Sequence, residues 1–552
     1  MVSSPSGFAL PDDASAPRRA KSSQGVPRRG PERNPAKPEI SEVRRSPSPT
    51  HRPGFGNLRS RHRTSGGANR RVGGRCLHGT CFAKSIRMPR IALFPRRDSS
   101  ARHRRPAILP VFAWLFVVLR GVADDWPQWM GPHRDGVWRE TGILSRFDSN
   151  GPPRVWTVPV NPGYVGPAIA SGRLYLVDRK AETPPERKKG ERGSPEMPGH
   201  ERVLCLEAKT GKTVWEHAYS RPYRIAYPAG PRATPLVHSN RVYTLGAMGD
   251  LKCLDARDGT VSWSLDLPAR YACDPPVWGY AAHPLLVEDR LIVPVGGTNS
   301  ALVAFDAASG REIWKALTAH EIGYAPPVLA EASGRSQVLF WHPDAVSGLD
   351  PKTGTVLWSH PYPVGGKPQR PEVTIAMPRI AGRQVFLTSF YQGSLLLDIP
   401  AEGLAPRVAW NRRSSKQSEM TEGLHTVMST PVLSAGNIYG FCAFGELRCL
   451  DLATGDRTWE SLDVFDGQGG FFAHAFIVEQ DGRHWFWNDQ GELLLGKLSP
   501  KGFERIGKAK ILETRETTRG RDVLWCHPAF ADRHMWVHNG RELVCLDLSA
   551  RS

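Results

Sequence analysis

Three histidines, His283, His474 and His527, occupy one position of a pattern that recurs along the chain. Each follows Ala or Cys and stands directly before Pro or Ala, at the start of an apolar stretch. Imidazoles are common ligands of zinc, and a zinc ion held by protein side chains can activate water for hydrolysis. The histidine pattern therefore makes metal-dependent hydrolysis one candidate class of chemistry.

Two further polar side chains stand in the same register. Arg232 lies close to Thr234 in a related triplet, and His425 precedes Thr426, which makes both weaker candidates for the same region. The apolar stretch after each triplet has the length of a short strand. If these strands line the axis of a ring, Arg232 and the three histidines face a central funnel. The alternative is that the histidines only cap strand ends through hydrogen bonds.

The order of the repeats argues against a single metal centre. His474 and His527 belong to neighbouring repeats, whereas His283 belongs to one that is far around any ring the repeats could form. Three imidazole ligands of one zinc ion must each lie about 2.1 Å from it. We therefore expect no three-histidine metal site.

A short phrase that ends in Trp organises the chain. CLDARDGTVSW (253–263) has close copies about every fifty residues, including CLEAKTGKTVW (205–215) and CLDLATGDRTW (449–459). Periods of forty to fifty residues with strand-like content predict the blades of a β-propeller. A two-helix repeat is the rival, but the units alternate and lack helical periodicity. The aligned acidic positions are Glu207, Asp255, Asp306, Asp350, Asp398, Asp451, then Gly496 in a degraded copy, and Asp547.

Each repeat predicts four antiparallel strands. TPLVHSNRVYTLG (234–246) places apolar residues around a short polar turn, which is typical of a hairpin, and two more strands flank the turn of the phrase itself. Asp255 is expected to accept hydrogen bonds from the amides of that turn, and Gly259 to take its left-handed backbone. The Trp is expected to wedge between neighbouring blades and to donate to a backbone carbonyl. The predicted docking tryptophans are Trp156, Trp215, Trp263, Trp314, Trp358, Trp410 and Trp459.

The two ends of the repeat region predict how the ring closes. The last unit, LVCLDLSARS, stops before its Trp, whereas DSNGPPRVWTVPV (148–160) supplies a turn and Trp156 with no first three strands. Together they make one blade, and closing the ring removes free sheet edges. We predict an all-β fold, an eight-bladed β-propeller of four-stranded antiparallel blades that is closed by an N-terminal strand on the C-terminal blade.

Charge separates a leader from the rest of the chain. The 552 residues carry a formal charge of +19, and residues 1–123 hold 25 Lys+Arg against 6 Asp+Glu, which accounts for all of it. The charge therefore gives no support to a nucleic-acid surface on the propeller. Residues 1–87 predict a disordered basic leader. That leader is either an arm of the protein or a stretch upstream of the start codon used in the cell.

Residues 88–123 have the layout of a signal peptide. Arginines precede the apolar stretch AILPVFAWLFVVL (107–119), and the small residues Gly121 and Ala123 follow it. The apolar stretch is short for a transmembrane helix. We expect cleavage before Asp124 and a periplasmic or secreted propeller of residues 124–552 that works as a monomer, with no membrane span and no nucleic-acid partner.

The cysteines do not predict a disulfide framework. Seven follow the leader, which is an odd number for an exported protein. Four stand two residues before the acidic position of their repeats and are interpreted as small core residues. These four are Cys205, Cys253, Cys449 and Cys545.

The phrase LD-x-x-T-G-x-x-x-W resembles the tryptophan-docking repeat of pyrroloquinoline-quinone (PQQ) propellers, and the resemblance covers nearly all of 124–552. That superfamily includes quinoprotein alcohol dehydrogenases and BamB-like proteins. DWPQWMGPHRDG (125–136) resembles the start of exported members found in planctomycete-type bacteria. The resemblance implies the fold more strongly than the activity.

Two functions follow from this resemblance. Family dehydrogenases hold PQQ against a disulfide of adjacent cysteines, with Ca²⁺ near an Asp base, and this chain has no adjacent cysteine pair and no C-x-x-C-H haem motif. We therefore expect a non-catalytic, BamB-like scaffold that binds an envelope protein or a polysaccharide. The alternative is a PQQ-dependent quinoprotein oxidoreductase of the alcohol or sugar dehydrogenase type, with PQQ and Ca²⁺ as cofactors. Residues 179–202, 365–374 and 411–426 are expected to form rim loops where a partner would bind.

Overall fold

The computed structural model describes residues 124–183, 196–332, 334–400, 405–414, 420, 422–518 and 520–550. The predicted leader and signal peptide lie outside these residues. Parts of two predicted rim loops, 184–195 and most of 415–421, also lie outside them.

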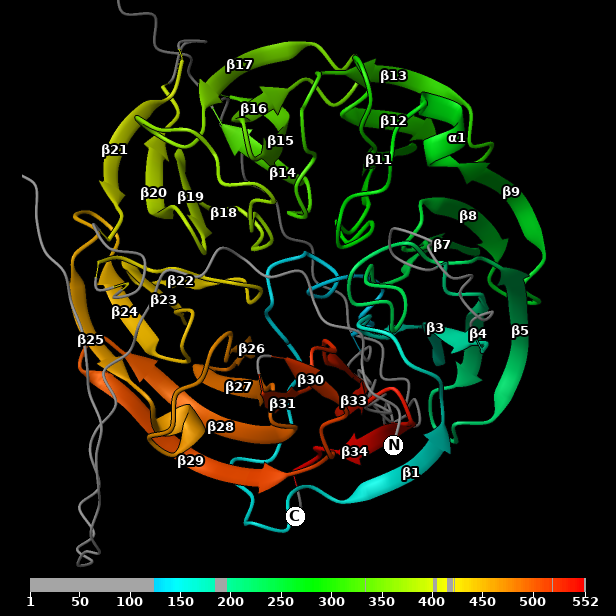
Figure 1. Ribbon diagram of the computed structural model, residues 1–552. Helices are drawn as coiled ribbons and strands as arrows, with labels where there is room; N and C mark the ends of the chain where they lie inside the picture. The colour runs from blue at the N-terminus through cyan, green and yellow to red at the C-terminus, as the bar shows by residue number, and fades with distance from the viewer. Residues whose placement is uncertain are drawn as a thin grey trace, which may run out of the picture. The chain divides into compact units, whose positions relative to one another are not determined.

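Eight four-stranded antiparallel sheets form the blades of a ring in the described part of the chain (Figure 1). The predicted eight-bladed, all-β propeller is confirmed. Blades 1 to 4 are β2 (Ala168–Ala170), β3 (Arg173–Ala181), β4 (Gly199–Glu207) and β5 (Thr213–Ser220); β6 (Leu236–His238), β7 (Arg241–Leu245), β8 (Asp250–Asp255) and β9 (Val261–Asp266); β10 (Leu285–Val287), β11 (Arg290–Pro294), β12 (Leu302–Asp306) and β13 (Glu312–Ala316); β14 (Val328–Ala332), β15 (Arg335–His342), β16 (Ala345–Leu349) and β17 (Val356–Pro361).

Blades 5 to 7 follow in the same order, and blade 8 combines both ends of the propeller. They are β18 (Arg379–Ala381), β19 (Gln384–Ser389), β20 (Gly393–Asp398) and β21 (Arg407–Arg412); β22 (Val432–Ser434), β23 (Asn437–Phe441), β24 (Leu447–Asp451) and β25 (Arg457–Ser461); β26 (Ala475–Gln480), β27 (Arg483–Asn488), β28 (Glu492–Ser499) and β29 (Gly502–Lys510); and β32 (Ala529–Ala531), β33 (His534–His538), β34 (Glu542–Asp547) and β1 (Arg154–Pro159).

Few elements stand outside the blades. The described residues contain one short helix, α1 (Leu267–Tyr271), a 3-10 turn, η1 (Asp463–Phe465), and a hairpin of β30 (Glu516–Thr518) and β31 (Arg521–Val523) between blades 7 and 8. None of the helices in this part of the chain is long and apolar enough to cross a membrane.

The ring closes as the repeat pattern predicts. β1 pairs antiparallel with β34, and Trp156 lies opposite Cys545. The N-terminal strand therefore completes the sheet whose other three strands come from the C-terminus (Figure 1). The four repeat-position cysteines are fully buried and free, as expected of small core residues.

The repeated phrase fixes the joint between neighbouring blades. Asp255 accepts a hydrogen bond from the amide of Arg257 (2.8 Å), and Gly259 has a φ of +76°. A Cβ on Gly259 would lie 2.5 Å from the ring of Trp215 in the preceding blade, so glycine is required there for space as well as for backbone conformation. Trp215 donates its indole hydrogen to the carbonyl of Ala256 (3.1 Å), beside the same turn.

Six of the seven predicted tryptophans dock across a blade boundary in this way. Their indole nitrogens lie 2.9 to 3.2 Å from backbone carbonyls of the following blade. The pairs are Trp156 with Ala208, Trp215 with Ala256, Trp263 with Ala307, Trp314 with Pro351, Trp410 with Leu452, and Trp459 with Ser499.

Trp358 departs from the prediction. Its indole donates to the side-chain oxygen of Gln337 in its own blade (2.6 Å) instead of a carbonyl of blade 5. In blade 5, Ile399 and Pro400 follow Asp398, and the sequence has no glycine four residues after the acidic position, where blades 1 to 4 and 6 have one. A Cβ on Gly348 would lie 2.4 Å from the indole, so the glycine at this position makes room for the inward bond.

Blade 7 shows a second departure and corrects the alignment. A β-bulge follows the cysteine position in all eight blades, and in blade 7 it falls between Leu495 and Gly496. The structural counterpart of the acidic residue is therefore Lys497, one residue after the predicted Gly496. Gly507 pairs with Leu495 where other blades have a docking Trp, and Phe147 from the N-terminal segment lies against it.

Candidate functional site

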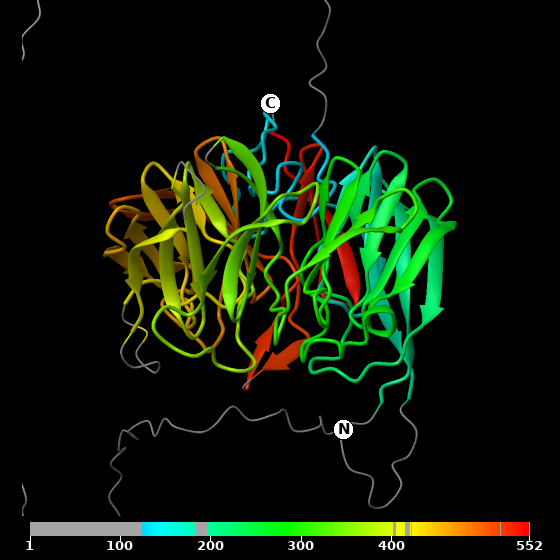
Figure 2. The ribbon, with the colours of Figure 1, turned by 90° about the horizontal axis from the view of Figure 1, so that it is seen from above.

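The first strand of each blade lines the axis, and the N-terminal segment fills the space between these strands. Residues 126–138, called the axial plug here, contact the inner edges of blades around the whole ring. Figure 2 shows this segment in cyan near one face of the ring and the β30–β31 hairpin at the opposite face. Its backbone contacts include Trp126 with Ile169, Pro127 with Val237, Asp135 with Arg379, and Trp138 with Glu479.

Trp129 of the axial plug brings two of the predicted histidines together. Its ring stacks on His283 with 4.4 Å between centroids and 6° between planes, and it meets His527 edge-on at 4.1 Å. The rings of His283 and His527 are only 5.6 Å apart. The expectation that His283 lies far from His527 was therefore wrong, because the inner strands of an eight-bladed ring converge on a narrow axis.

Arg134 holds the plug from its other side. The guanidinium is buried and donates to the carbonyls of Pro284 (2.8 Å), His283 (3.4 Å) and Pro327 (3.4 Å), which belong to blades 3 and 4. Its fourth acceptor is the side-chain oxygen of Gln128 (3.4 Å), and no carboxylate of the described residues is among its hydrogen-bond partners. Burial lowers the pKa of Arg134 to about 10. Neutral carbonyl groups therefore accept all of these hydrogen bonds from the guanidinium.

Burial keeps the axial histidines neutral. It lowers the pKa of His283 and of His527 well below the usual range, and the neighbouring Arg134 lowers that of His283 further. The pKa of His474 is lowered by burial as well, although Asp489 lies 3.9 Å from its Nδ1 and opposes the shift. His283 accepts the amide hydrogen of Thr234 (2.9 Å), just before β6. This is a hydrogen bond at a strand end, of the kind that the capping interpretation expects.

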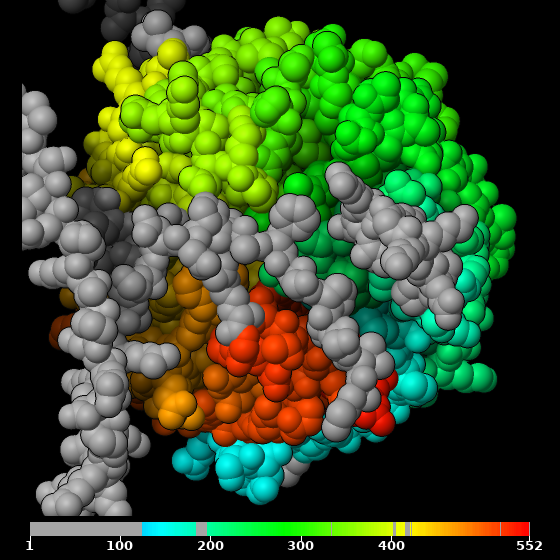
Figure 3. All heavy atoms as spheres, in the orientation of Figure 1, coloured from blue at the N-terminus to red at the C-terminus, as the bar shows by residue number. Residues whose placement is uncertain are grey.

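The other two candidates are committed to loop backbone. Arg232 is buried, donates to the carbonyls of Gly230, Ala226 (3.0 Å) and Tyr227 (2.5 Å), and lies over the ring of Tyr164. His425 shares a hydrogen bond with the carbonyl of Phe390 (2.8 Å). Both therefore shape the connections on the hairpin-bearing face of the ring, which Figure 3 shows in space-filling form, instead of meeting the three histidines.

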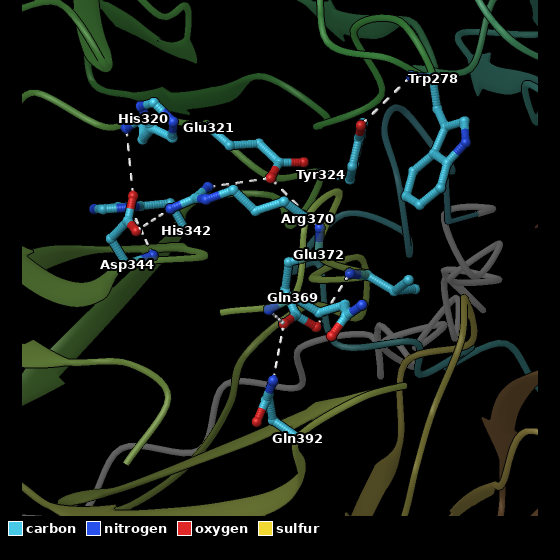
Figure 4. Close-up of polar contacts among 11 residues, drawn as sticks. Trp278, His320, Glu321, Tyr324, His342, Asp344, Gln369, Arg370, Glu372 and Gln392 are labelled. Carbon is cyan, nitrogen blue, oxygen red and sulfur yellow. Dashed lines mark hydrogen bonds and ion pairs between the residues drawn. The ribbon is translucent and has the colours of Figure 1, made fainter. Parts of the chain in front are cut away.

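A polar network that sequence reasoning missed lies between blades 3, 4 and 5. Arg370 bridges Glu321 (3.3 Å) and Asp344, and Glu372 accepts hydrogen bonds from Gln392 (3.1 Å) and neighbouring groups (Figure 4). Burial raises the pKa of Glu321 and of Glu372. Glu321, Asp344 and Gln392 lie in three connections that are separate from the one with Arg370 and Glu372. No local sequence motif therefore indicates this network.

Trp129 and Arg134 were also missed, although DWPQWMGPHRDG carries a weak signal. Two tryptophans and an arginine in a segment with no strand periodicity are unusual for a solvated linker. Their burial explains this composition.

Arg134→Met is expected to lower the free energy of unfolding by about 1–3 kcal/mol, because three buried carbonyls lose their donor. Denaturant unfolding of the full chain measures this. Arg139→Met is the matched control: its side chain is 44% exposed and pairs with Asp135 in the same segment, so its effect should stay within about 0.5 kcal/mol. Equal effects would show that the plug is not anchored through Arg134.

The residues present do not fit a PQQ site of the dehydrogenase type. All seven cysteines of the described chain are free, and the described residues contain no group of three or more His, Cys, Asp or Glu placed to hold a metal ion. The cavity beside Trp129 and His527 measures about 20 Å³, which is room for about one water molecule. The indole of Trp129 and the guanidinium of Arg134 occupy the axis themselves.

Comparison with known proteins agrees with the repeat. The model of a family described as outer membrane protein assembly factor BamB matches residues 199–461. The chain is 29% identical over 185 residues to quinohemoprotein alcohol dehydrogenase ADH-IIG of Pseudomonas putida (31% of this chain, 25% of that protein). It is 25% identical over 238 residues to BamB of Moranella endobia (strain PCIT) (41% and 56%). The chain thus spans about a quarter and about half the length of these relatives.

Solved structures with related folds were also found. BamB from Moraxella catarrhalis aligns with a TM-score of 0.46 at 16% identity, over 71% of this chain and 97% of that one. A europium-containing methanol dehydrogenase aligns with a TM-score of 0.49 at 11% identity, over 77% and 89%. The docking repeat, the eight blades that it joins and the family match over residues 199–461 together show that this chain is similar to the PQQ-like β-propellers.

Proposed function

We propose that this chain is an exported, non-catalytic scaffold of the cell envelope, working in the periplasm or outside the cell, that binds a partner envelope protein. The observation that carries the proposal is the axial plug. Trp129 and Arg134 fill the place where the eight inner strands converge, and the remaining cavity there holds about one water molecule. Because the centre of the ring is occupied by the chain itself, a partner would bind on the outer surface of the ring.

The hairpin-bearing face offers a suitable surface. Val277 is 53% exposed and Tyr227 is 40% exposed, and their loops are joined by a hydrogen bond from the amide of Ala226 to the carbonyl of Val277 (2.9 Å). Trp278 follows directly and packs on Tyr324. Exposed aromatic and branched side chains on a rigid base are typical of protein interfaces.

The family match supports the choice of partner class. The matching model is described as an assembly factor for outer membrane proteins, which is a role carried out by binding other proteins. The predicted export signal supports the same compartment, and it lies outside the described residues. A polysaccharide is the other ligand considered, since Trp278 could also stack on a sugar ring.

A photo-crosslinking amino acid placed at Val277 of the full chain is expected to give a discrete, protease-sensitive adduct in living cells. The matched control is Val214 on β5, which is 38% exposed on the side of the ring. Adducts of equal yield at both positions, or none at Val277, would contradict the proposed face. An adduct that resists protease but is removed by glycosidases would indicate that the partner is a polysaccharide and not a protein.

The quinoprotein alternative is favoured by one observation, the 29% identity to a quinohemoprotein alcohol dehydrogenase over 185 residues. Absorbance titration of the purified full chain with PQQ and Ca²⁺ separates the two functions. The scaffold proposal expects no saturable binding. Tight binding with reduction of an electron-accepting dye would establish the oxidoreductase instead.

A further inference from the structure

We propose that Glu140 binds the α-ammonium group that proteolytic cleavage before Asp124 would produce. This contact would stabilise the axial plug in the ring of the mature protein. This inference rests on the export that the proposed function includes. It concerns a modification site in this chain and the residue that receives its product.

Glu140 already joins the start of the plug segment to blade 8. Its Oε1 accepts the amide hydrogens of Asp124 (3.0 Å) and Asp532 (2.6 Å), and its Oε2 accepts that of Arg533 (2.5 Å). Asp532 and Arg533 form the tight turn between β32 and β33, with φ values of +45° and +57°. One carboxylate therefore gathers three donors from segments almost 400 residues apart.

The position of the Asp124 nitrogen is set by its neighbours. Both carboxylate oxygens of Asp125 lie within 3.1 Å of the amide nitrogen of Ser171. The next residue, Trp126, exchanges two backbone hydrogen bonds of 2.9 Å with Ile169 of β2. With residues 125 and 126 held in this register, the nitrogen of Asp124 is fixed at Glu140 whether or not residue 123 is attached.

The charges around Glu140 leave a place for a cation. The side chain is half-buried, and burial raises its pKa despite the three amide donors. Asp532 raises the pKa further. Arg139 pairs with Asp135 and also interacts with the charge of Asp124, and the side chain of Arg533 extends past Gly142. The side chain of Glu140 is bonded to three backbone amides and to no cation of the described residues, so an α-ammonium on Asp124 would supply a counter-charge there.

Cleavage supplies that group by simple hydrolysis. Water adds across the peptide bond between Ala123 and Asp124, the C–N bond breaks, and the products are a carboxylate on Ala123 and an amine on Asp124. The amine takes up a proton at neutral pH, because its ordinary pKa is about 7.7–8.0. The hydrogen bond to the Glu140 carboxylate then joins two charged groups instead of one, so that it is an ion pair as well as a hydrogen bond.

The pH dependence follows from the direction of this pairing. The ammonium gains a partner on folding, so its pKa in the folded state is raised above the unfolded value. The ammonium stabilises the fold fully at pH values below its pKa in the unfolded chain. This stabilisation is lost as the pH rises through its pKa in the folded protein. The uncleaved chain has no ionisable group at this nitrogen and lacks this dependence.

The test compares protein purified from the envelope with the uncleaved full chain, each with and without Glu140→Gln. N-terminal sequencing should find Asp124 first in the envelope protein. Acylation of its α-amine near pH 7 should be about tenfold slower than in Glu140→Gln, since a pKa raised by about one unit lowers the free-amine fraction about tenfold. Glu140→Gln should also lower the melting temperature more in the cleaved than in the uncleaved protein.

The control is Glu504→Gln, whose side chain is 69% exposed; it should change neither the acylation rate nor the melting temperature. A mature chain that starts at Asp124 but acylates equally fast with and without Glu140→Gln overturns the proposed contact at Glu140 and leaves export standing. Retention of residues 1–87 on the protein in the cell overturns export, and the contact with it. A mature N-terminus elsewhere overturns the contact alone.

Discussion

Replacing Arg154–Pro159 by glycine and serine of equal length is expected to make the full chain aggregate. This strand is β1, the outer strand that closes the ring on β34. The replacement removes Trp156, which is half-buried and donates to the carbonyl of Ala208 in blade 1 (3.0 Å). It also leaves β34 as an open edge able to pair with other chains. Size-exclusion chromatography and thermal unfolding measure both effects.

The control for this replacement is the same change in Glu516–Thr518. These residues form β30, a strand of the two-stranded hairpin that belongs to no blade. The chain with glycine and serine at 516–518 should not aggregate. If the β1 replacement eluted and melted like the unchanged chain, the closure of the ring would not depend on this strand.

Trp314→Ala is expected to lower the free energy of unfolding by about 3–5 kcal/mol, which is the cost of emptying a buried aromatic site. Trp314 is 7% exposed and donates to the carbonyl of Pro351 across the boundary between blades 3 and 4 (3.1 Å). Equilibrium denaturation of the full chain measures the change. An effect within about 0.5 kcal/mol, the range of ordinary surface changes, would contradict the docking role.

A pair of glycine substitutions tests the other side of the same joint. Gly354 has a φ of +72°, and a Cβ there would lie 2.6 Å from the ring of Trp314. Gly482 has a φ of +70° and nothing within 4 Å of the corresponding position. Gly482→Ala should cost only the left-handed backbone strain of about 1–2 kcal/mol, whereas Gly354→Ala adds overpacking of about 1–3 kcal/mol.

The ring could be predicted because the residues that join neighbouring blades belong to one repeated sequence phrase. Most of the turns have an acidic residue and a glycine, and six boundaries have a docking Trp, so counting the phrase counts the blades. The exception at Trp358 was not predicted, although the sequence shows that blade 5 lacks the glycine that stands four residues after the acidic position in blades 1 to 4 and 6. The shift from Gly496 to Lys497 was less accessible, because blade 7 has neither the glycine turn nor the Trp that fixes the register.

The contents of the axis could not be predicted in the same way. Register assigns His283 to blade 3 and His527 to blade 8, yet the distance between them depends on how closely the inner strands approach. Trp129 and Arg134 lie in a segment without periodicity, and their partners are distant in sequence. No pattern in a single sequence links residues that are separated by more than a hundred positions and joined only through an axis.

The axial plug also bears on the order in which the protein folds. Arg134 contacts carbonyls 150 and 193 residues further along, and the amide of Trp138 bonds to Glu479. Loops of this length are closed late, since many chain conformations must be given up before the contact forms. The first residues of the ring to leave the ribosome are therefore among the last to reach their final positions. Until then, the inner strands surround an unfilled axis, and refolding is expected to show a slow final phase that burial of Trp129 reports by fluorescence.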